Sequence, residues 1–422
     1  MTHLEAFRGR ACGSGGVTPM DRTARVRPRS ATVSIGPMDH LDARYPVTLG
    51  FTPRDRSFPD PDRPPLLRAR PRAATPYGDD GVEDHVCEAI DMVQDHSVRP
   101  DVFTFGFDRV DLSEHDDLQA ACSEIARTGS ISEPIASAIR AALDGAVLRS
   151  SSGRRLRVMF VAAEGLILRT GGPNRMAFSA PNSKGMNGHG PAVAVHADQD
   201  VHGTPLVQLM DGRAPELFRH DSPGGHNHDA SLMLVNLWIP IRQITRPLVL
   251  GDGRSVDRVK DQARYGLATD TFLDRDDDQL VNDIWTFLHD PDQRWYFRSE
   301  MDHRSAYVFN TLSTPHASGI LPGEDVAERC YLALEQAASA VGRGDATELE
   351  LAAAGDLEAP DGTPPALRRS ISEMAALLSE AGTDPVAVGS PEAEAWSARA
   401  LAARRSVVRM SVELRLVVSA ER

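Results

Sequence analysis

Short apolar segments separated by turn residues follow one another from about Arg154 to residue 336, and this texture limits the possible folds most strongly. Many short strands with few helices predict an antiparallel barrel or sandwich. Two of the segments flank Glu164-Gly165 and predict a hairpin, and the stretch from Leu280 to Leu288 predicts a helical insert. The strand candidates are residues 156–161, 166–168, 192–195, 232–241, 247–250, 294–297, 307–311, 316–321 and 329–334.

The first 80 residues are rich in Arg, Pro and Gly and show little periodicity. The run from Pro61 to Pro65 cannot enter a helix or a central strand. We expect residues 1–80 to form a partly disordered leader, with one strand around Tyr45 to Phe51.

Residues 81–150 are expected to form a helical segment that packs on the β core. Val86, Ile90 and Val93 fall at helical spacing, and the same spacing recurs between 135 and 143. Ser132 offers an N-cap for that second helix, with Pro134 in its first turn.

The C-terminal part of the chain, residues 337–422, is Ala-rich and predicted to be a helical extension. Proline residues interrupt it near 355–365, and a long helix is predicted from Pro391 to Ser406. Residues 407–418 fit either a helix or a strand. We expect this extension to pack on the barrel or on a second subunit.

The overall composition is that of a soluble globular protein, with 422 residues, 41% hydrophobic and 25% charged. A net charge of −14 argues against a nucleic-acid binder, which needs a basic face. No apolar stretch is long enough to span a membrane, and the N-terminal residues lack the apolar h-region of a secretion signal, so secretion is not expected. The chain has four cysteines, Cys12, Cys87, Cys122 and Cys330. Because they are scattered and lack the spacing of a metal site, we expect them to be reduced, mostly buried thiols of a cytoplasmic protein.

One pattern indicates a metal site. His196-Ala197-Asp198 lies at the end of an apparent strand, and Thr314-Pro315-His316 stands far downstream. Residues i and i+2 of a strand lie on the same side, so His196 and Asp198 can converge on one ion. His316 must arrive from another strand. Two imidazoles and one carboxylate are the ligand set of a non-haem iron(II) oxygenase, and they leave half of the coordination sphere open.

The His-x-Asp/Glu triplet alone is common, since this chain has four of them. Two lie in the leader, and the one at His115 stands in an acidic stretch. Only His196 follows a run of small and β-branched residues that is entered from a Gly-rich turn, residues 185–190. A double-stranded β-helix, the jelly-roll of cupins, satisfies both the strand count and the placement of these ligands.

Five stretches in a fixed order extend the pattern over about residues 190–323. They are Val195-His196-Ala197-Asp198-Gln199, Val235-Asn236-Leu237-Trp238-Ile239-Pro240-Ile241, Arg246-Pro247-Leu248-Val249-Leu250-Gly251-Asp252-Gly253-Arg254-Ser255-Val256, Arg294-Trp295-Tyr296-Phe297 with Met301, and Thr314-Pro315-His316. This region resembles the CmcJ/NvfI-type family of iron(II)/2-oxoglutarate-dependent oxygenases, which hydroxylate or desaturate natural products.

The resemblance implies that His196, Asp198 and His316 are the iron ligands and that 2-oxoglutarate is the co-substrate. Two positions depart from the family pattern. The family often has Arg at the position of Leu312, and it tends to have Arg at the position of Ile239. These departures concern the anchors of co-substrate and substrate rather than the metal.

The distal carboxylate of 2-oxoglutarate needs a fixed cation, and a bidentate Arg matches its geometry best. In barrels of this type that Arg usually opens the strand after the distal histidine. The candidate is therefore Arg329, before Cys330, and Arg254 is the runner-up. Asn236 and Trp238 alternate on one face of their strand and are candidates to line the substrate pocket, although both also fit an ordinary core.

Two other functions stay open. His220 and His226-Asn227-His228-Asp229 are material for a zinc-dependent hydrolase, although their loop fits solvent exposure better. The chain also fits a catalytically silent jelly-roll that serves as a binding module. The preferred prediction is a cytoplasmic iron(II)/2-oxoglutarate-dependent dioxygenase that acts on a small natural-product intermediate and releases succinate. Its partners would be that substrate, dioxygen and a second copy bound through the C-terminal helices, with no nucleic acid and no membrane.

Overall fold

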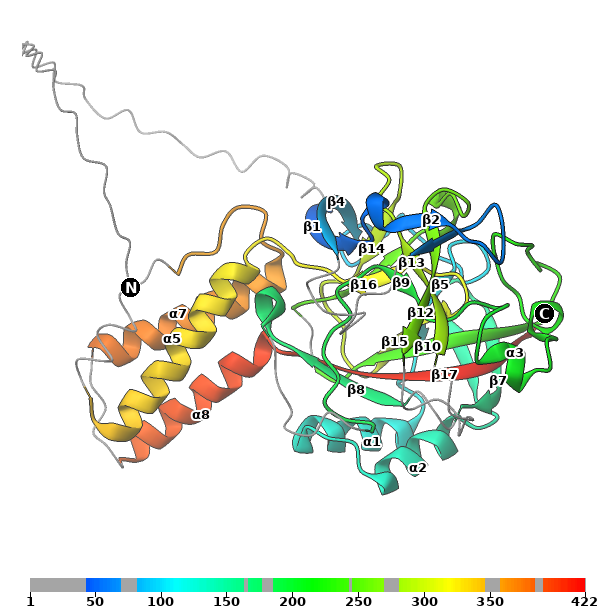
Figure 1. The fold of residues 1–422 in the computed structure, drawn as a ribbon. Helices are drawn as coiled ribbons and strands as arrows, with labels where there is room; N and C mark the ends of the chain where they lie inside the picture. The colour runs from blue at the N-terminus through cyan, green and yellow to red at the C-terminus, as the bar shows by residue number, and fades with distance from the viewer. Residues whose placement is uncertain are drawn as a thin grey trace, which may run out of the picture. The chain divides into compact units, whose positions relative to one another are not determined.

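A computed structural model describes residues 43–69, 82–162, 166–176, 185–242, 245–268, 281–345, 357–383 and 390–421. All of them belong to the unit Leu41–Arg422. Within it the strands form two large sheets, and helices cover these sheets or extend from them (Figure 1).

The first sheet has ten strands and contains two parallel pairs, β14 with β4 and β12 with β3, while its other pairs are antiparallel. Its strands, in spatial order, are β1 (Arg44–Phe51), β4 (Glu83–Asp91), β14 (Trp295–Phe297), β11 (Leu248–Gly251), β16 (His316–Ser318), β9 (His196–Ala197), β13 (Val281–Phe287), β12 (Gln262–Ala268), β3 (Leu67–Ala69) and β2 (Ser57–Pro59).

The second sheet is antiparallel throughout and curls on itself, because β10 pairs with both β15 and β17. Its strands, in spatial order, are β10 (Leu232–Pro240), β15 (Ser305–Asn310), β5 (Phe107–Asp111), β6 (Val147–Ser150), β7 (Arg155–Val161), β17 (Arg409–Glu421) and β8 (Ile167–Gly171). The C-terminal strand β17 therefore lies in the middle of this sheet.

Alternation along β10 assigns its two faces. Met233, Val235 and Leu237 pack in one apolar cluster with side chains of α1 (Asp116–Thr128) and α2 (Glu133–Leu143). Trp238, on the other face, packs with side chains of the first sheet such as Leu250 of β11. The period of two thus places α1 and α2 on one side of the second sheet and the first sheet on the other.

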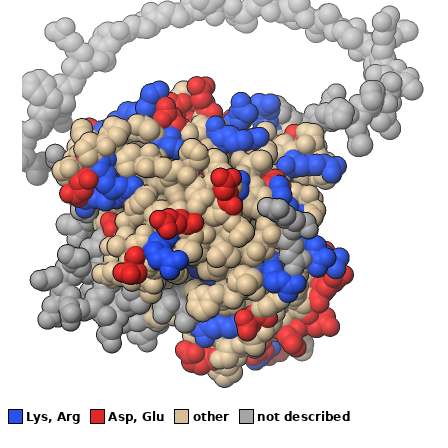
Figure 2. Space-filling view, turned by 90° about the vertical axis from the view of Figure 1, so that its right-hand side faces the viewer, with Lys and Arg blue, Asp and Glu red and all other residues tan. Residues whose placement is uncertain are grey.

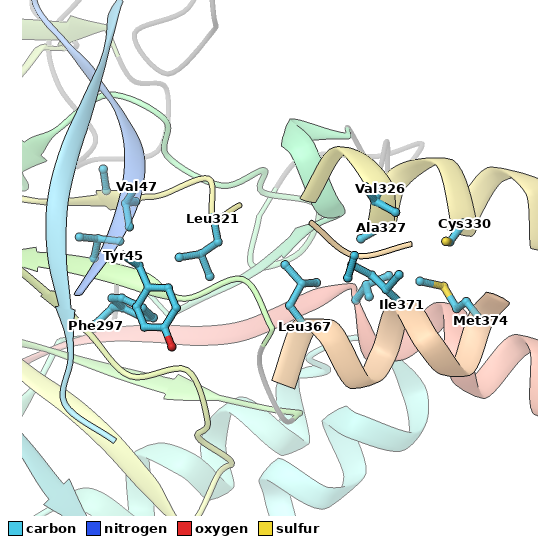
Figure 3. Packing of buried hydrophobic residues seen from close by; sticks show 14 of the residues in the cluster. Tyr45, Val47, Phe297, Leu321, Val326, Ala327, Cys330, Leu367, Ile371 and Met374 are labelled. Atoms are coloured by element: carbon cyan, nitrogen blue, oxygen red, sulfur yellow. The ribbon is translucent and has the colours of Figure 1, made fainter. Parts of the chain in front are cut away.

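Three long helices, α5 (Glu324–Arg343), α7 (Pro365–Thr383) and α8 (Pro391–Ser406), lie in the chain between β16 and β17. They share one hydrophobic cluster with the first sheet. Figure 3 follows this cluster from Tyr45 and Val47 on β1 through Leu321 to Leu367 and Ile371 on α7. The helices therefore pack on the β core, as one of the two sequence alternatives predicts.

The remaining helical segments are short: α3 (Leu206–Leu209), α4 (Ala214–Leu217) and 3₁₀ turns at Arg54–Arg56, Pro173–Arg175 and Gly253–Ser255. No described helix is long and apolar enough to cross a lipid bilayer. On the face shown in Figure 2, basic and acidic side chains are mixed, and neither sign covers it.

Several sequence predictions are confirmed. α2 begins after Ser132 with proline in its first turn, α8 spans Pro391–Ser406, and β1, β10, β11, β14, β15 and β16 overlap the expected segments. Of residues 407–418, for which helix and strand stayed open, those from Arg409 onward belong to strand β17. Cys87, Cys122 and Cys330 are buried free thiols, while Cys12 lies outside the described residues. The chain is a mixed α+β protein.

Other predictions are wrong. Besides the expected strand β1, the first 80 residues contain β2 and β3, which were not expected and which extend the first sheet. The segment from Val86 to Ile90 is a strand rather than a helix. Val86 is 71% exposed, whereas Cys87 and Ala89 are buried. This alternation is the period of two of a strand, and the strand β4 lies between β1 and β14.

Three further corrections follow from the topology. The expected helix over Leu280–Leu288 is strand β13, which lies between β9 and β12. The expected strand at 329–334 is part of α5. β7 and β8 do not form a hairpin with each other, since β17 lies between them and pairs with both.

Candidate metal centre

Two histidines far apart in the sequence stand directly opposite each other in the first sheet. β9 and β16 are antiparallel neighbours, and His196 pairs with His316. Directly paired residues project to the same face. The two imidazole ring centres are 4.3 Å apart, and both side chains are buried.

Asp198 completes the group. Its Oδ1 atom lies 3.6 Å from His196 Nε2, and its Oδ2 atom lies 3.5 Å from His316 Nε2. One ligand atom from each residue lies within 4.8 Å of the others, and no other trio of His, Cys, Asp or Glu in the described ranges is placed in this way. The sequence prediction that these three residues converge is confirmed.

The backbone fixes the orientation of both rings. His196 Nδ1 lies 2.8 Å from the carbonyl oxygen of Ala194, and His316 Nδ1 lies 3.1 Å from that of Thr314. A carbonyl oxygen only accepts, so each Nδ1 carries the proton and each Nε2 keeps its lone pair. This arrangement is typical of metal-binding histidines.

Asn236 of β10 holds the carboxylate from the second sheet. Its Nδ2 donates to Asp198 Oδ2 at 2.8 Å, and the Thr311 hydroxyl donates to Asn236 Oδ1 at 2.6 Å. Because the amide oxygen is engaged by a hydroxyl, its NH₂ group is directed at the carboxylate. Asn236 was predicted to line the substrate pocket, and the structure gives it a contact with a ligand carboxylate instead.

The charges at the centre favour metal binding. Burial alone would raise the pKa of Asp198, but His316, His196 and Arg415 outweigh it and lower that pKa below its usual range. Arg415 Nη2 lies 3.8 Å from Asp198 Oδ1. Burial, followed by the nearby His196, lowers the pKa of His316 to about 4, so this imidazole is neutral at pH 7. An ionised carboxylate and a neutral imidazole are the forms that bind metal.

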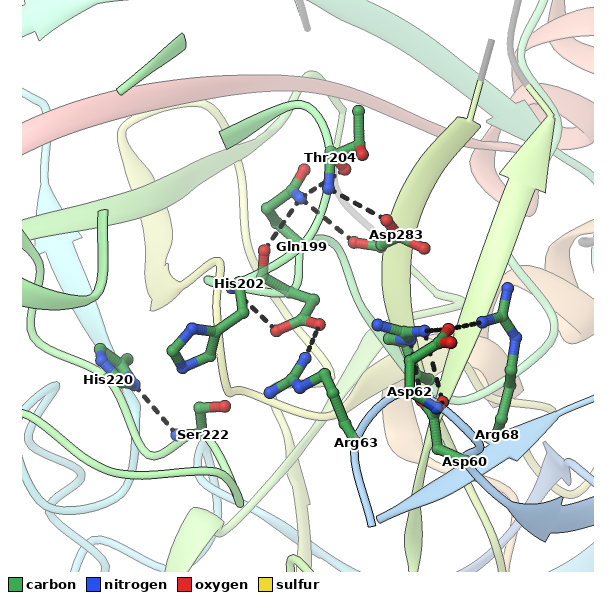
Figure 4. Close-up of polar contacts among 12 residues, drawn as sticks. Asp60, Asp62, Arg63, Arg68, Gln199, His202, Thr204, His220, Ser222 and Asp283 are labelled. Atoms are coloured by element: carbon green, nitrogen blue, oxygen red, sulfur yellow. Dashed lines mark hydrogen bonds and ion pairs between the residues drawn. The ribbon is translucent and has the colours of Figure 1, made fainter. Parts of the chain in front are cut away.

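The loop after Asp198 is tied down by buried polar contacts (Figure 4). Gln199 Nε2 donates to the backbone oxygens of Asp200, Thr204 and Asp283, at 2.9 to 3.1 Å. The carboxylate of Asp200 is fully buried and forms an ion pair with Arg63, which arrives from the turn between β2 and β3. These contacts fix the chain beside the metal ligand.

The inner face of β17 brings charged groups that the sequence analysis missed. Arg409, Ser411, Glu413 and Arg415 alternate with apolar residues that pack against α1 and α2. Glu413 forms an ion pair with Arg169 of β8 at 2.6 Å.

Arg409 is buried at 2% exposure, and its Nε and Nη1 atoms have no hydrogen-bond partner among the described residues. Ser411 Oγ, two residues away on the same face, is likewise buried without such a partner. Burial, followed by the guanidinium of Arg246, lowers the pKa of Arg409 to about 9. A cation with unfilled donors in the interior is costly unless an anion binds it.

The two arginines predicted to anchor the co-substrate lie elsewhere. Arg329 is half-exposed on α5, where it pairs with Asp325 one turn away. The strand that it was expected to open does not exist. Arg254 is half-exposed, pairs with Asp252 and lies over the Phe105 ring. Neither arginine forms a hydrogen bond or an ion pair with His196, Asp198 or His316.

Trp238 is buried beside Tyr307 and 5.7 Å from the Arg409 guanidinium. The two positions that depart from the family pattern are apolar core residues. Leu312 packs with Val201 and Phe218, and Ile239 faces the α1–α2 side of its sheet.

The His-rich loop does not form a second metal cluster within the described ranges. His228 pairs with Asp221, and both are about half-exposed. His220 is buried and is held by the Pro215 carbonyl and by the backbone N–H of Ser222. The loop thus lacks the convergence that a zinc hydrolase needs.

Comparison with known proteins gives three findings. The family described as an oxidoreductase/YMDC permease-like domain matches residues 173–320, a region that contains all three ligands. No curated protein matches the chain. Among solved structures, the chain is similar to the iron and alpha-ketoglutarate-dependent endoperoxidase NvfI at 13% identity and a TM-score of 0.44, and to that enzyme in a different conformation at 12% and 0.45.

Both matches cover 90% of this chain and 99% of the other. The function proposed below rests on the side chains of this chain.

Proposed function

We propose that this protein is an iron(II)- and 2-oxoglutarate-dependent oxygenase that hydroxylates or desaturates a small organic molecule. One observation carries the proposal: the buried convergence of His196, Asp198 and His316, with both Nε2 atoms directed at the carboxylate. Two imidazoles and one carboxylate on one side of an ion match the non-haem iron(II) oxygenases, which need open positions for co-substrate and dioxygen. When bound, iron(II) would activate dioxygen, the oxidant; 2-oxoglutarate would be oxidised to succinate and CO2 by one oxygen atom, and the other would serve to oxidise a substrate C–H bond.

The residues present fit the co-substrate as well. A dicarboxylate needs a cation away from the metal, and Arg409 offers buried guanidinium donors without partners, with the Ser411 hydroxyl on the same face. A planar guanidinium binds a carboxylate through two parallel hydrogen bonds. We therefore assign Arg409 and Ser411 to the distal carboxylate of 2-oxoglutarate.

Arg409 also fits the rule from which Arg329 was predicted. The anchoring arginine was expected to open the strand after the distal histidine. The strand that follows β16 in the chain is β17, and Arg409 is its first residue. The helices α5, α7 and α8 separate the two strands in sequence.

We also infer that the two facing sheets are the layers of a double-stranded β-helix. The metal ligands lie on β9 and β16 of the first sheet, and Asn236 reaches Asp198 from β10 of the second. The centre therefore lies between the sheets, where the layers of such a fold enclose a site.

The test is turnover with purified protein, iron(II), 2-oxoglutarate and oxygen, measured as oxygen uptake and succinate release. Succinate should form slowly without a second substrate, and His316→Ala should abolish it. Arg409→Gln should raise the KM for 2-oxoglutarate at least about tenfold, since one charge-assisted pair is lost. Arg329→Gln, which changes an exposed arginine on α5, is the matched control and should behave as wild type.

The alternatives give different results in the same assay. A zinc hydrolase would work without oxygen, and a silent binding module would produce no succinate and would retain no iron. Either result would overturn the proposal. A wild-type KM in the Arg409→Gln variant would remove only the assignment of the anchor.

A further inference from the structure

A cavity of about 330 Å³ lies apart from the three metal ligands, between the chain that follows β4 and the strands β5 and β15. This volume is at the lower end of pockets that bind small molecules. The side chains that line it are mostly cationic or apolar. They include Arg99, Arg109, Arg298, Met92, Phe107 and Tyr307.

Two polar groups at this cavity have unused hydrogen-bonding capacity. Tyr307 is 1% exposed, and its hydroxyl makes no hydrogen bond of good geometry to a described group, although the backbone N–H of Arg298 lies nearby. Even if that N–H donates to the phenol oxygen, the O–H proton remains available. Arg298 Nη1 donates to the Met92 carbonyl, while its Nε is buried without a partner among the described residues.

The charges around the cavity are predominantly positive. Tyr307 stands opposite Arg109 in the β15–β5 ladder, so both project to the same face. Burial and the nearby Arg109 lower the pKa of Arg298, and an anion would relieve both effects. Arg99 and His96 add exposed basic groups at the edge.

Two carboxylates close by offset part of this charge but leave an excess of one cation. Asp108 accepts hydrogen bonds from the hydroxyls of Ser151 and Ser152 and from a backbone N–H, so its oxygens are occupied. Asp91 accepts two backbone N–H groups through Oδ1, and its Oδ2 is buried without a described partner. Three arginines therefore face two carboxylates, one of which is saturated.

The apolar part of the lining indicates the rest of the ligand. Met92, Phe107 and Val98 belong to the apolar cluster between the sheets. Phe107 pairs with Phe309, whose ring centre is 4.5 Å from that of His316. The aromatic layer formed by Phe107 and Phe309 on neighbouring strands thus contacts the cavity through Phe107 and His316 through Phe309.

We propose that this cavity is a binding site for a small organic carboxylate with an apolar body. The acid group binds Arg298, Arg109 and the Tyr307 hydroxyl, and the apolar body packs on Phe107 and Met92. The site is distinct from the one assigned to 2-oxoglutarate at Arg409. Its ligand contacts the same aromatic layer that packs against His316.

The test is calorimetric titration of the metal-free protein with phenylacetate, and with phenylacetamide as the neutral analogue. Phenylacetate should saturate one site with a dissociation constant of about 1 mM or lower, and the amide should bind at least about tenfold more weakly. Tyr307→Phe, which keeps the ring, should weaken phenylacetate binding about fivefold to tenfold. Arg298→Gln should weaken it at least tenfold, by the loss of a charge-assisted pair.

Arg304→Gln, an exposed arginine before β15 that does not line the cavity, is the control and should bind as wild type. No saturable binding, equal binding of acid and amide, or affinity unchanged by both cavity variants would overturn the proposal. Because the protein is metal-free, these results do not depend on whether the triad holds iron.

Discussion

Replacing Asn236 by Leu tests how the second sheet controls the metal centre. The side chain is 3% exposed and donates to Asp198 Oδ2 at 2.8 Å. Leucine keeps the branched shape but is larger, and it removes the donor, so an unfolding measurement must accompany the metal titration. A hydrogen bond to a charged group contributes about 1.5–3 kcal/mol, and loss of a partner that orients a ligand costs about 10- to 100-fold in metal affinity.

These two magnitudes agree, because a tenfold change in an equilibrium constant corresponds to about 1.4 kcal/mol. We therefore expect Asn236→Leu to weaken iron(II) binding by about 10- to 100-fold. Thr311→Val should weaken it less, by a few-fold, since the amide loses only the hydroxyl that orients it.

The assay is an anaerobic iron(II) titration against a competing chelator, with the free energy of unfolding measured by urea on the same metal-free variants. Asn310→Leu is the matched control, because Asn310 is a buried asparagine whose amide donates to the Arg219 backbone at 3.0 Å. It should lose stability and keep its metal affinity. Wild-type iron affinity in a folded Asn236→Leu protein would refute the reasoning.

Three other predictions concern stability and reactivity. Arg63→Met should lower the free energy of unfolding in urea by about 3 kcal/mol, since it leaves the buried Asp200 carboxylate without its cation; a change under about 0.5 kcal/mol would contradict this. Burial, followed by Arg63, lowers the pKa of His202 to about 4, against about 6.5 in the unfolded chain. Between these values the unfolded chain binds more protons, so stability falls as pH falls. His202→Gln should reduce the loss between pH 7 and pH 5 by about 1 kcal/mol after allowance for partial exposure, and parallel urea profiles for both proteins would count against it. Burial raises the pKa of both the Cys87 and the Cys122 thiol to about 12, so neither should react with a disulfide reagent at pH 8 until urea unfolds the protein; rapid labelling of the native chain would disprove this.

The convergence of His196, Asp198 and His316 could be predicted from the sequence because its signal is local. His196 and Asp198 are two residues apart after an apolar strand, and the matching stretches fix the partner at His316. Strand β10 and helices α2 and α8 were also predictable, since each has a clear period or cap. What the sequence could not show was the pairing across sheets, such as that of Asn236 with Asp198.

The sequence did not point to Arg409, the anchor that we propose, because three helices separate β16 from the next strand. Arg329 is thirteen residues after His316, whereas β17 begins at Arg409. The signal was present. Residues 409–416 alternate polar and apolar side chains with a period of two, which predicts a strand with two distinct faces. Inward-facing strand residues are usually expected to be apolar, so the polar positions of β17 would have been assigned to the outer face.

The error at β4 has the opposite cause. Val86, Ile90 and Val93 fit a helical period, but Val86 is exposed and the buried positions are Cys87 and Ala89. In the sequence, the helical spacing of these three large apolar residues was a stronger signal than the alternation of the smaller Cys87 and Ala89, which indicates a strand. Pairing with β1 on one side and β14 on the other decided the structure.

The most direct measurement for the central claim is the stoichiometry of iron(II) binding, by anaerobic equilibrium dialysis of the wild type and of His196→Ala, Asp198→Ala and His316→Ala. The account predicts one iron per chain for the wild type and almost none for each variant, with all variants folded by circular dichroism. Stoichiometric iron in any folded variant would show that these three side chains do not share one ion.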